Sequence, residues 1–284
     1  MDAPPAVRRL PQPPPVPVYA WRFGKAVLAA LWLAAVVAAA AYGVFGATIS
    51  VGLPVAALAA LLAWVGAGVR FAQLGVFARP LLRVQGVRGQ LALTFDDGPH
   101  PVHTPKVLAL LALHGHRATF FVIGERASRH PALLRAIVEG GHLIANHSLR
   151  HQPWTPALPA SQLAREWAAA NRTIAEATGI FPRWCRAPVG LVSPPVAEAA
   201  RRCGMLLVHW SVTARDGVAW ADRERCWSRL SRGLQAGAIA VLHDGVGGEN
   251  CAAVDLLPRV LDDMRARGLV SVTLDELLVS GPSQ

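Results

Sequence analysis

Two adjacent aspartates, Asp96 and Asp97, stand at the end of an alternating apolar run in the stretch LALTFDDGPH. Two histidines four residues apart, His147 and His151, follow a later apolar run, HLIAN. Two imidazoles and one carboxylate can hold a divalent cation and leave coordination positions open, while a second carboxylate acts as a base on water. We expect the histidines to share one face of a helical turn and the aspartates to point to different sides of the strand end.

Each of these patterns has a simpler alternative. The DDGP segment can be a polar turn, and an isolated pair of histidines can be ordinary surface or capping residues. The catalytic interpretation gains weight because further ionisable residues end other apolar runs: Arg186 in RWCRAPVG, and His243 with Asp244 in AIAVLHDG.

The elements that must position these residues begin at Gln90. Seven short β-rich stretches alternate with helical patterns that several times end in glycine. The expected strands are 90–95, 118–123, 142–146, 183–187, 206–210, 238–243 and 269–273, and the expected helices are 104–115, 130–141, 160–179, 193–204, 223–237 and 252–268. This alternation predicts a parallel sheet that is long enough to close into a barrel, with the chemistry at the carboxyl ends of the strands.

Four blocks of the sequence together resemble the polysaccharide deacetylase (NodB homology) family. They are TFDDGPH, HSLRH, RAPVG and VLHDG, in this order, and the segments ATFFVIG and VTLDELL are also similar. The resemblance covers about Gln90 to Leu278. It implies a distorted (β/α)7 barrel and the metal-dependent removal of an N-acyl group from an amino sugar.

The resemblance also implies roles for single residues. The ligands of a divalent cation, usually zinc, would be Asp97, His147 and His151. The residues that move or direct protons would be Asp96 as the base, Arg186 as its partner and His243 as the acid. The backbone N–H of Val189 would bind the oxyanion, and Leu242 would line the pocket for the acyl methyl group.

One block departs from the family pattern. The family's fourth motif has an aspartate followed by an aromatic residue, whereas here Asp216 is followed by Gly217. Asp216 can still be proposed as the residue that orients His243, and Trp210 or Trp220 can replace the missing aromatic in the sugar groove.

The N-terminal third has a different composition. Residues 1–25 form a Pro-rich basic tail, and residues 26–69 contain no charged residue. A single helix over these 44 residues would be about 66 Å long, roughly twice the bilayer core. Because glycines and a proline interrupt the run, we expect a transmembrane hairpin with helices at about 26–45 and 51–69, then a linker at 70–88 and the deacetylase domain at 89–280. The alternative is a cleaved signal peptide that ends near VFGA.

The charge distribution gives an orientation. Residues 1–85 hold seven Lys/Arg against one acid, and the basic residues flank the apolar run on both sides. The positive-inside rule then puts the protein in the inner membrane as a multi-pass protein, with the catalytic domain on the cytoplasmic face. The same distribution argues against nucleic-acid binding, because basic and acidic residues are interleaved in the rest of the chain.

The expected substrate is an N-acylated amino sugar, most simply N-acetylated, in a membrane-associated glycan or a polyprenyl-phosphate-linked glycolipid. Two alternatives stay open. One is deacetylation of an exported envelope polysaccharide such as peptidoglycan, and the other is a catalytically inactive sugar-binding relative.

Overall fold

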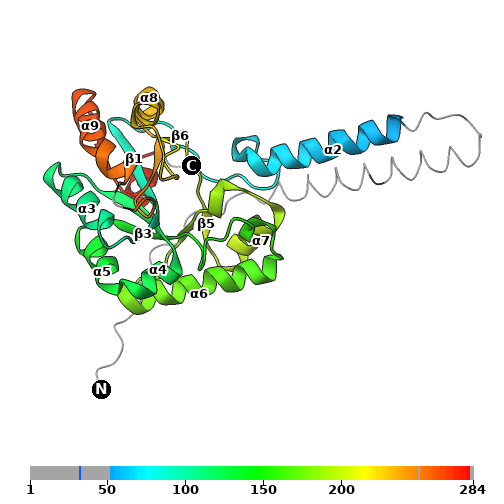
Figure 1. The fold of residues 1–284 in the computed structure, drawn as a ribbon, viewed down its shortest axis with the longest axis horizontal. Helices are drawn as coiled ribbons and strands as arrows, with labels where there is room; N and C mark the ends of the chain where they lie inside the picture. Colours follow the sequence, from blue (N-terminus) through cyan, green and yellow to red (C-terminus); the bar gives the residue numbers. More distant parts are fainter. Residues whose placement is uncertain (1–31, 33–51, 249, 282–284) are drawn as a thin grey trace, which may run out of the picture.

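The computed structural model describes residues 32, 52–248 and 250–281, and they form a curled parallel sheet with helices around its outer face (Figure 1). The strands are β1 Gln90–Gly98, β2 Ala118–Val122, β3 Leu143–Asn146, β4 Trp184–Cys185, β5 Leu206–Leu207, β6 Val212–Thr213, β7 Ile239–His243 and β8 Val270–Ser271. Their order is β5-β4-β3-β2-β1-β7-β6, and β8 pairs with the beginning of β1. All seven expected strands are confirmed, whereas the two-residue β6 was not expected.

The expected closed barrel is corrected to an open curl, since the hydrogen-bonded path of strands ends at β5 on one side and at β6 on the other. The segment before β1 lies across this opening. Leu81 forms a parallel bridge with Val208, and Arg83 forms an antiparallel bridge with Ala238. Residues that were expected to be a linker therefore pack directly against the sheet.

The six expected helices are also present, with ends that differ by a few residues. Their bounds are α3 His103–Leu113, α5 Pro131–Glu139, α6 Ala160–Thr178, α7 Pro194–Arg202, α8 Arg223–Gly233 and α9 Ala252–Ala266. Helices α4 Gly124–Arg129 and α10 Leu274–Val279 have six residues each. They are too short to show a helical period in the sequence. Short 3₁₀ helices lie at Ala72–Leu74, Thr155–Ala157 and Pro188–Gly190.

The side chains of β1 alternate between two buried layers. Leu93 and Phe95 belong to the core between the sheet and the helices, whereas Ala92 packs with Phe121 and Trp184 on the inner side of the curl. Burying a large apolar side chain contributes about 1.5–3 kcal/mol to the stability of the fold. The assignment of alternate β1 side chains to the two layers is therefore strongly fixed. It places Asp96 on the inner side, where the strands end.

The register of the central strands fixes which strand ends meet. Asp96 stands beside Phe121 of β2 on one side and beside His243 of β7 on the other. The pairing of β1 with β7 thus brings the predicted base and the predicted acid onto neighbouring strands.

Helix α2 Gly52–Arg70 projects from the sheet domain (Figure 1). Among the residues that the structure describes, no helix is long and apolar enough to cross a membrane. The second expected span, 51–69, corresponds to α2, and the first, 26–45, lies outside the described residues apart from Trp32. Within the described part of the chain no transmembrane hairpin is seen.

Candidate active site

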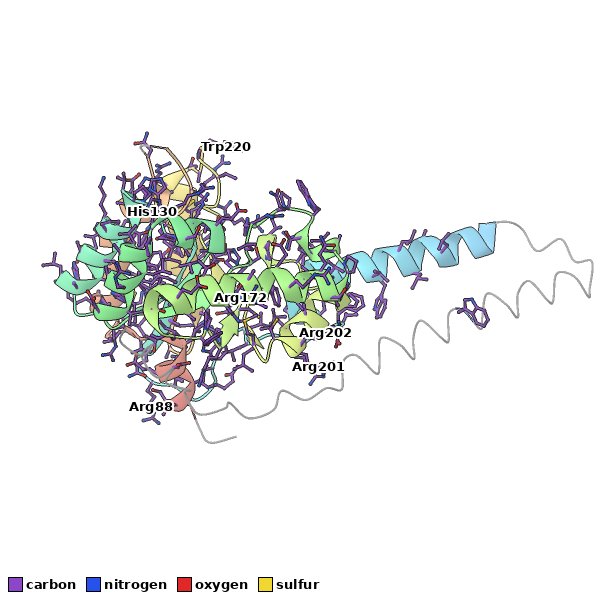
Figure 2. The ribbon with its side chains drawn as sticks, turned by 90° about the horizontal axis from the view of Figure 1, so that it is seen from below. Arg88, His130, Arg172, Arg201, Arg202 and Trp220 are labelled. Carbon is purple, nitrogen blue, oxygen red and sulfur yellow. The ribbon has the colours of Figure 1, made fainter. Side chains whose placement is uncertain are left out.

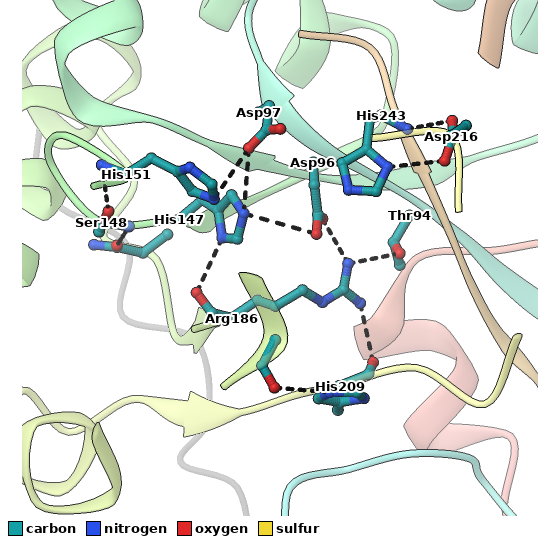
Figure 3. Close-up of polar contacts among 12 residues, drawn as sticks. Thr94, Asp96, Asp97, His147, Ser148, His151, Arg186, His209, Asp216 and His243 are labelled. Carbon is teal, nitrogen blue, oxygen red and sulfur yellow. Dashed lines mark hydrogen bonds and ion pairs between the residues drawn. The ribbon is translucent and has the colours of Figure 1, made fainter. Parts of the chain in front are cut away.

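Both aspartates at the end of β1 face the same group of residues (Figure 3). Asp97 has a left-handed backbone, with φ of 69°, and the register of β1 against β2 shifts between Asp96 and Gly98. As a result the Nε2 atom of His147 lies 3.8 Å from Asp96 Oδ2 and 3.5 Å from Asp97 Oδ1. The expectation that the two carboxylates point to different sides is wrong, because the bulge turns Asp97 back toward Asp96.

The two histidines come together through an irregular loop and not through the expected helical turn. Ser148 and His151 both have positive φ values, 67° and 51°, and the two imidazole centroids are 4.5 Å apart. Asn146 fixes this loop, because its Oδ1 accepts a hydrogen bond from Ser148 N and its Nδ2 donates to Asn171 Oδ1. Ser148 Oγ then accepts a hydrogen bond from His151 N. Local side-chain bonds of this kind replace the helical bonds.

The residues Asp97, His147 and His151 fit a divalent cation. Their ligand atoms lie within 4.8 Å of one another, and Asp97 Oδ1 is buried without a hydrogen-bond donor. The Nδ1 atom of His147 is 3.0 Å from the carbonyl oxygen of Arg186. A proton on Nδ1 satisfies that carbonyl and leaves the Nε2 lone pair directed at the carboxylate.

Burial and the neighbouring His151 lower the pKa of His147 well below its ordinary value, against the opposing effect of Asp97 and the Arg186 carbonyl. A neutral imidazole is the form that binds a metal ion. Burial, tautomer and geometry at His147 therefore all favour cation binding.

Arg186 is fully buried and holds the inner side of the site together. Its Nη1 atom donates to Asp96 Oδ1 at 2.6 Å and to Thr94 Oγ1 at 2.9 Å, and its Nη2 atom donates to the carbonyl oxygen of His209 at 3.0 Å. The guanidinium carbon lies 4.0 Å from the ring centroid of Phe121. These contacts fix the direction of the Asp96 carboxylate and balance its charge in a buried place.

His243 is held by a buried carboxylate on the other side of Asp96. Asp216 Oδ1 lies 2.8 Å from His243 Nδ1, and its Oδ2 accepts a hydrogen bond from His243 N at 2.9 Å. Burial lowers the pKa of His243, but the hydrogen bond and charge of Asp216, together with Asp96 and Asp97, raise it to about 9. The imidazole is therefore protonated at neutral pH. Its Nδ1–H is held by Asp216, and its Nε2–H remains available to a substrate.

The other predicted site residues have different positions. Val189 is exposed, with φ of 55°, in the loop that follows β4, and a side chain on the next residue, Gly190, would collide with the Trp210 ring. Trp210 stacks on His209 and packs against this loop at Gly190. Trp220 stands out from the surface (Figure 2), and its side chain is 83% exposed. The structure does not bring Trp220 together with the residues of the cation cluster.

The prediction that Leu242 lines the acyl pocket is wrong. Leu242 is fully buried in the core between the sheet and the helices, where its strand neighbour is Phe95. Because strand residues alternate between faces, His243 and Val241 share the other face. Val241 is thus the residue of β7 on the side of the site.

Arg126 of α4 is a site residue that the sequence analysis missed. Its Nη1 atom donates to the carbonyl oxygens of Asp97 at 2.7 Å and of Gly245 at 2.5 Å, so it joins the ends of β1 and β7. A Cβ atom on Gly245 would lie 2.0 Å from the Asp97 carbonyl, so only glycine permits this approach. No local pattern around GERASR signals the role, because both partners of Arg126 are backbone atoms from distant segments.

The position of Asp244 explains why glycine follows the two aspartates of β1. It is fully buried, and its Oδ2 accepts a hydrogen bond from Thr104 Oγ1 at 2.5 Å. Burial is the largest cause that raises its pKa to about 7, and the charges of Asp97 and Asp96 add to it. A Cβ atom on Gly98 would lie 2.7 Å from Asp244 Oδ1, which explains the glycine after the two aspartates.

Comparisons with known proteins agree with this geometry. A sequence profile described as polysaccharide deacetylase matches residues 84–208. A chitooligosaccharide deacetylase of a Bradyrhizobium species is 39% identical over 180 residues, which are 62% of this chain and 80% of that protein. The chain belongs to the polysaccharide deacetylase family.

Other relatives of this polysaccharide deacetylase extend the comparison. A peptidoglycan N-acetylglucosamine deacetylase of Bacillus cereus is 33% identical over 196 residues, 66% of this chain and 87% of that protein. The structure of a family 4 acetyl xylan esterase from Clostridium thermocellum, in complex with a cobalt ion, matches with a TM-score of 0.62 and 31% identity, covering 67% of this chain and 90% of that one. As its relatives are carbohydrate deacetylases and esterases, the chain is an N-deacetylase acting on carbohydrate.

The bridge made by Arg126 gives the first testable expectation. Arg126→Ala should weaken the binding of a divalent cation by about 10–100-fold, the range found when a residue that orients a ligand is removed. Titration of the metal-free protein with Zn²⁺ and a competing chelator measures this. Arg129→Ala, which alters an exposed arginine of the same helix, is the matched control and should bind Zn²⁺ like the wild type. Equal affinity in all three proteins would contradict the role of Arg126.

Proposed function

We propose that this deacetylase removes the N-acetyl group of an amino sugar with the help of a divalent cation, Zn²⁺, held by Asp97, His147 and His151. The observation that supports the proposal is the meeting of a carboxylate, a cation-ligand cluster and a protonated imidazole at one end of the sheet. One Asp and two His ligands suit Zn²⁺ and leave coordination positions open. A cation held there would polarise the amide carbonyl and lower the pKa of nearby water.

The proton steps are assigned to this chain's own residues. Asp96, held by Arg186, takes a proton from the attacking water while the oxygen atom of that water bonds to the amide carbon. His243 gives its Nε2 proton to the nitrogen as the carbon–nitrogen bond breaks, which leaves a free amine and acetate. Asp216 keeps His243 oriented and protonated until that step.

The remaining residues are assigned to the substrate. The exposed loop at Val189 offers its backbone N–H to the developing oxyanion, a contribution worth about 3 kcal/mol when such a donor is removed from other enzymes. Gly217 lies against the His243 ring, where a Cβ atom would be 3.1 Å from Nε2.

The substrate and location belong to the same proposal. The chitooligosaccharide and peptidoglycan substrates in the names of the relatives support an N-acetylglucosamine unit. We propose that the apolar region 26–69 holds the chain at the inner membrane as a hairpin, with the catalytic domain on the cytoplasmic face and a polyprenyl-phosphate-linked sugar as substrate. Export of the domain, with peptidoglycan as substrate, is the alternative that the Bacillus cereus relative favours.

The role of Asp96 can be separated from that of the proposed cation ligands by substitution. Asp96→Asn should keep the cation and lose about 10²–10⁴-fold in deacetylation rate, because the base is removed while the three proposed cation ligands stay. His147→Ala should lose both the cation and the activity, because a three-ligand site loses a ligand. Metal analysis and acetate release from N-acetylglucosamine oligomers measure the two effects. A metal-free Asp96→Asn protein beside a fully loaded His147→Ala protein would refute the assignment.

The hydrogen bond from Asp216 predicts a pH effect. With the pKa of His243 at about 9, kcat/KM should fall as the pH rises through that value and the acid loses its proton. Asp216→Asn removes the charge that raises the pKa, so burial dominates and the alkaline limb should move down by about 1–3 pH units. Asp222→Asn, at the exposed N-cap of α8, should leave the limb in place. An unmoved limb in Asp216→Asn would exclude His243 as the acid.

The topology can be tested by chemical labelling. A cysteine at Gly46 should react with an impermeant maleimide added to spheroplasts, whereas a cysteine at Ser283 should react only after lysis. This pattern follows from the basic residues on both flanks of the apolar region and their absence within it. Labelling of the Ser283 position in intact spheroplasts would put the domain outside and make an envelope polysaccharide the substrate.

A further inference from the structure

The end of α2 is attached to the loop that carries Val189. The carbonyl oxygen of Val69, in the last turn of α2, accepts a hydrogen bond from Val192 N at 3.0 Å. Trp64 of α2 packs edge-on against Phe77, with ring centroids 6.1 Å apart. The end of α2 is therefore bonded to Val192, which is three residues after Val189, the residue assigned to the oxyanion.

The same loop is joined to the segment that follows the cation ligands. Ser193 Oγ donates a hydrogen bond to the carbonyl oxygen of Pro156 at 2.5 Å. Trp154 lies two residues before Pro156 and three residues after His151. Hydrogen bonds thus connect the end of α2, the loop at Val189 and the segment at Trp154 along one side of the site.

This side of the site exposes large apolar side chains, which we call the α2 rim. They are Leu58 (56% exposed), Leu62 (61%), Phe71 (45%), Leu74 (57%), Trp154 (61%) and Val189 (57%). Single exposed apolar residues are ordinary, but a group of them on connected segments marks a surface that another apolar phase covers.

The composition of α2 indicates that this phase is lipid. Every residue from Leu58 to Val69 is glycine, alanine or a larger apolar residue, and exposed positions include Ala59, Ala60 and Ala63 as well as the two leucines. A protein interface has a polar rim, which this helix lacks. Arg70 follows directly, with its guanidinium carbon 5.4 Å from the Phe71 ring centroid. Basic and aromatic residues at the end of an apolar helix are typical of the boundary with anionic head groups.

We propose that the α2 rim is in contact with a lipid bilayer, so that the active site opens beside the membrane and receives an amino sugar carried on a lipid. α2 projects from the domain in two perpendicular views (Figures 1 and 2). The inference rests on the proposed deacetylase function and adds the side from which the substrate arrives. Val189 belongs to the rim, and His151 precedes the rim residue Trp154 by three residues, so a sugar held on a lipid head group reaches them without leaving the membrane surface.

The test places an environment-sensitive fluorophore on the full chain in vesicles of phosphatidylethanolamine and phosphatidylglycerol. Labelled cysteines at Leu74 and Trp154 report the rim, and labelled cysteines at Leu113 and Val279, exposed apolar positions outside it, are the matched controls. The half-buried Cys203 is replaced by serine to prevent background labelling. Rim labels should emit at shorter wavelength and be quenched by brominated lipid, and control labels should do neither.

Three results would overturn or support the proposal. Rim labels that behave like the controls overturn it, even when the protein deacetylates soluble chitooligosaccharide and the proposed function stands. If the emission of the rim labels moves to shorter wavelength but brominated lipid does not quench it, another protein surface and not lipid covers the rim. That result also overturns the proposal. Quenched rim labels in a protein that releases no acetate from any amino sugar support the surface while the proposed function fails.

A second variant links the surface to the substrate. Phe71→Gln with Leu74→Gln should leave acetate release from soluble chitooligosaccharide unchanged and raise KM for a lipid-linked amino sugar by about tenfold or more, because two large apolar side chains no longer enter the bilayer. The exchange Leu113→Gln with Val279→Gln is the control and should change neither rate. An equal loss on both substrates would indicate a damaged domain and contradict a role at the membrane.

Discussion

The buried ion pair of Arg186 and Asp96 is the contact on which the candidate site depends. The guanidinium joins β1 to the segment after β5, and the backbone carbonyl of the same arginine accepts the Nδ1 proton of His147. One residue thus directs the proposed base and also sets the tautomer of a cation ligand. A buried pair is costly to break, typically by about 3–5 kcal/mol, because the remaining charge stays without a partner in a place that water does not reach.

Positive φ values at three residues of the site bring its side chains together. A regular strand would separate neighbouring side chains, yet Asp96 and Asp97 converge because Asp97 is left-handed. His147 and His151 converge because Ser148 and His151 are left-handed as well. Such backbones are rare outside glycine and persist where the surroundings determine them. Here the surroundings are the hydrogen bond that Ser148 N donates to Asn146 Oδ1 and the one that Arg126 donates to the Asp97 carbonyl oxygen.

The elements of the domain could be predicted from sequence because hydrophobic periodicity reports burial. The run Gln90 to Phe95 alternates as a strand between two buried layers, and the strand is there. The ligand set also followed from residue types and from the family resemblance. The loop geometry of His147 and His151 could not be predicted, because their spacing fits a helical turn equally well.

Two other features were not predicted, for different reasons. Leu242 is adjacent to His243 in a strand, so the alternation of strand faces, which is visible in the sequence, puts its side chain in the layer opposite the imidazole. Arg126 was missed because its partners are carbonyl oxygens, which no residue type reveals. Sequence patterns identify side chains that do chemistry more readily than side chains that hold backbone.

The register between β1 and β7 decides whether the candidate site can form at all. Asp96 stands opposite His243, and Phe95 stands opposite Leu242. A slip of one residue between these strands would turn every side chain of β7 to the opposite layer. A leucine would then stand beside the base, and an imidazole would be trapped under the helices without Asp216. Asp97 lies at the end of β1 and shares Arg126 with the carbonyl oxygen of Gly245, which follows β7, so the slip would reach the candidate cation site as well. A single error of register would therefore misplace the proposed acid and loosen the proposed ligand Asp97 together.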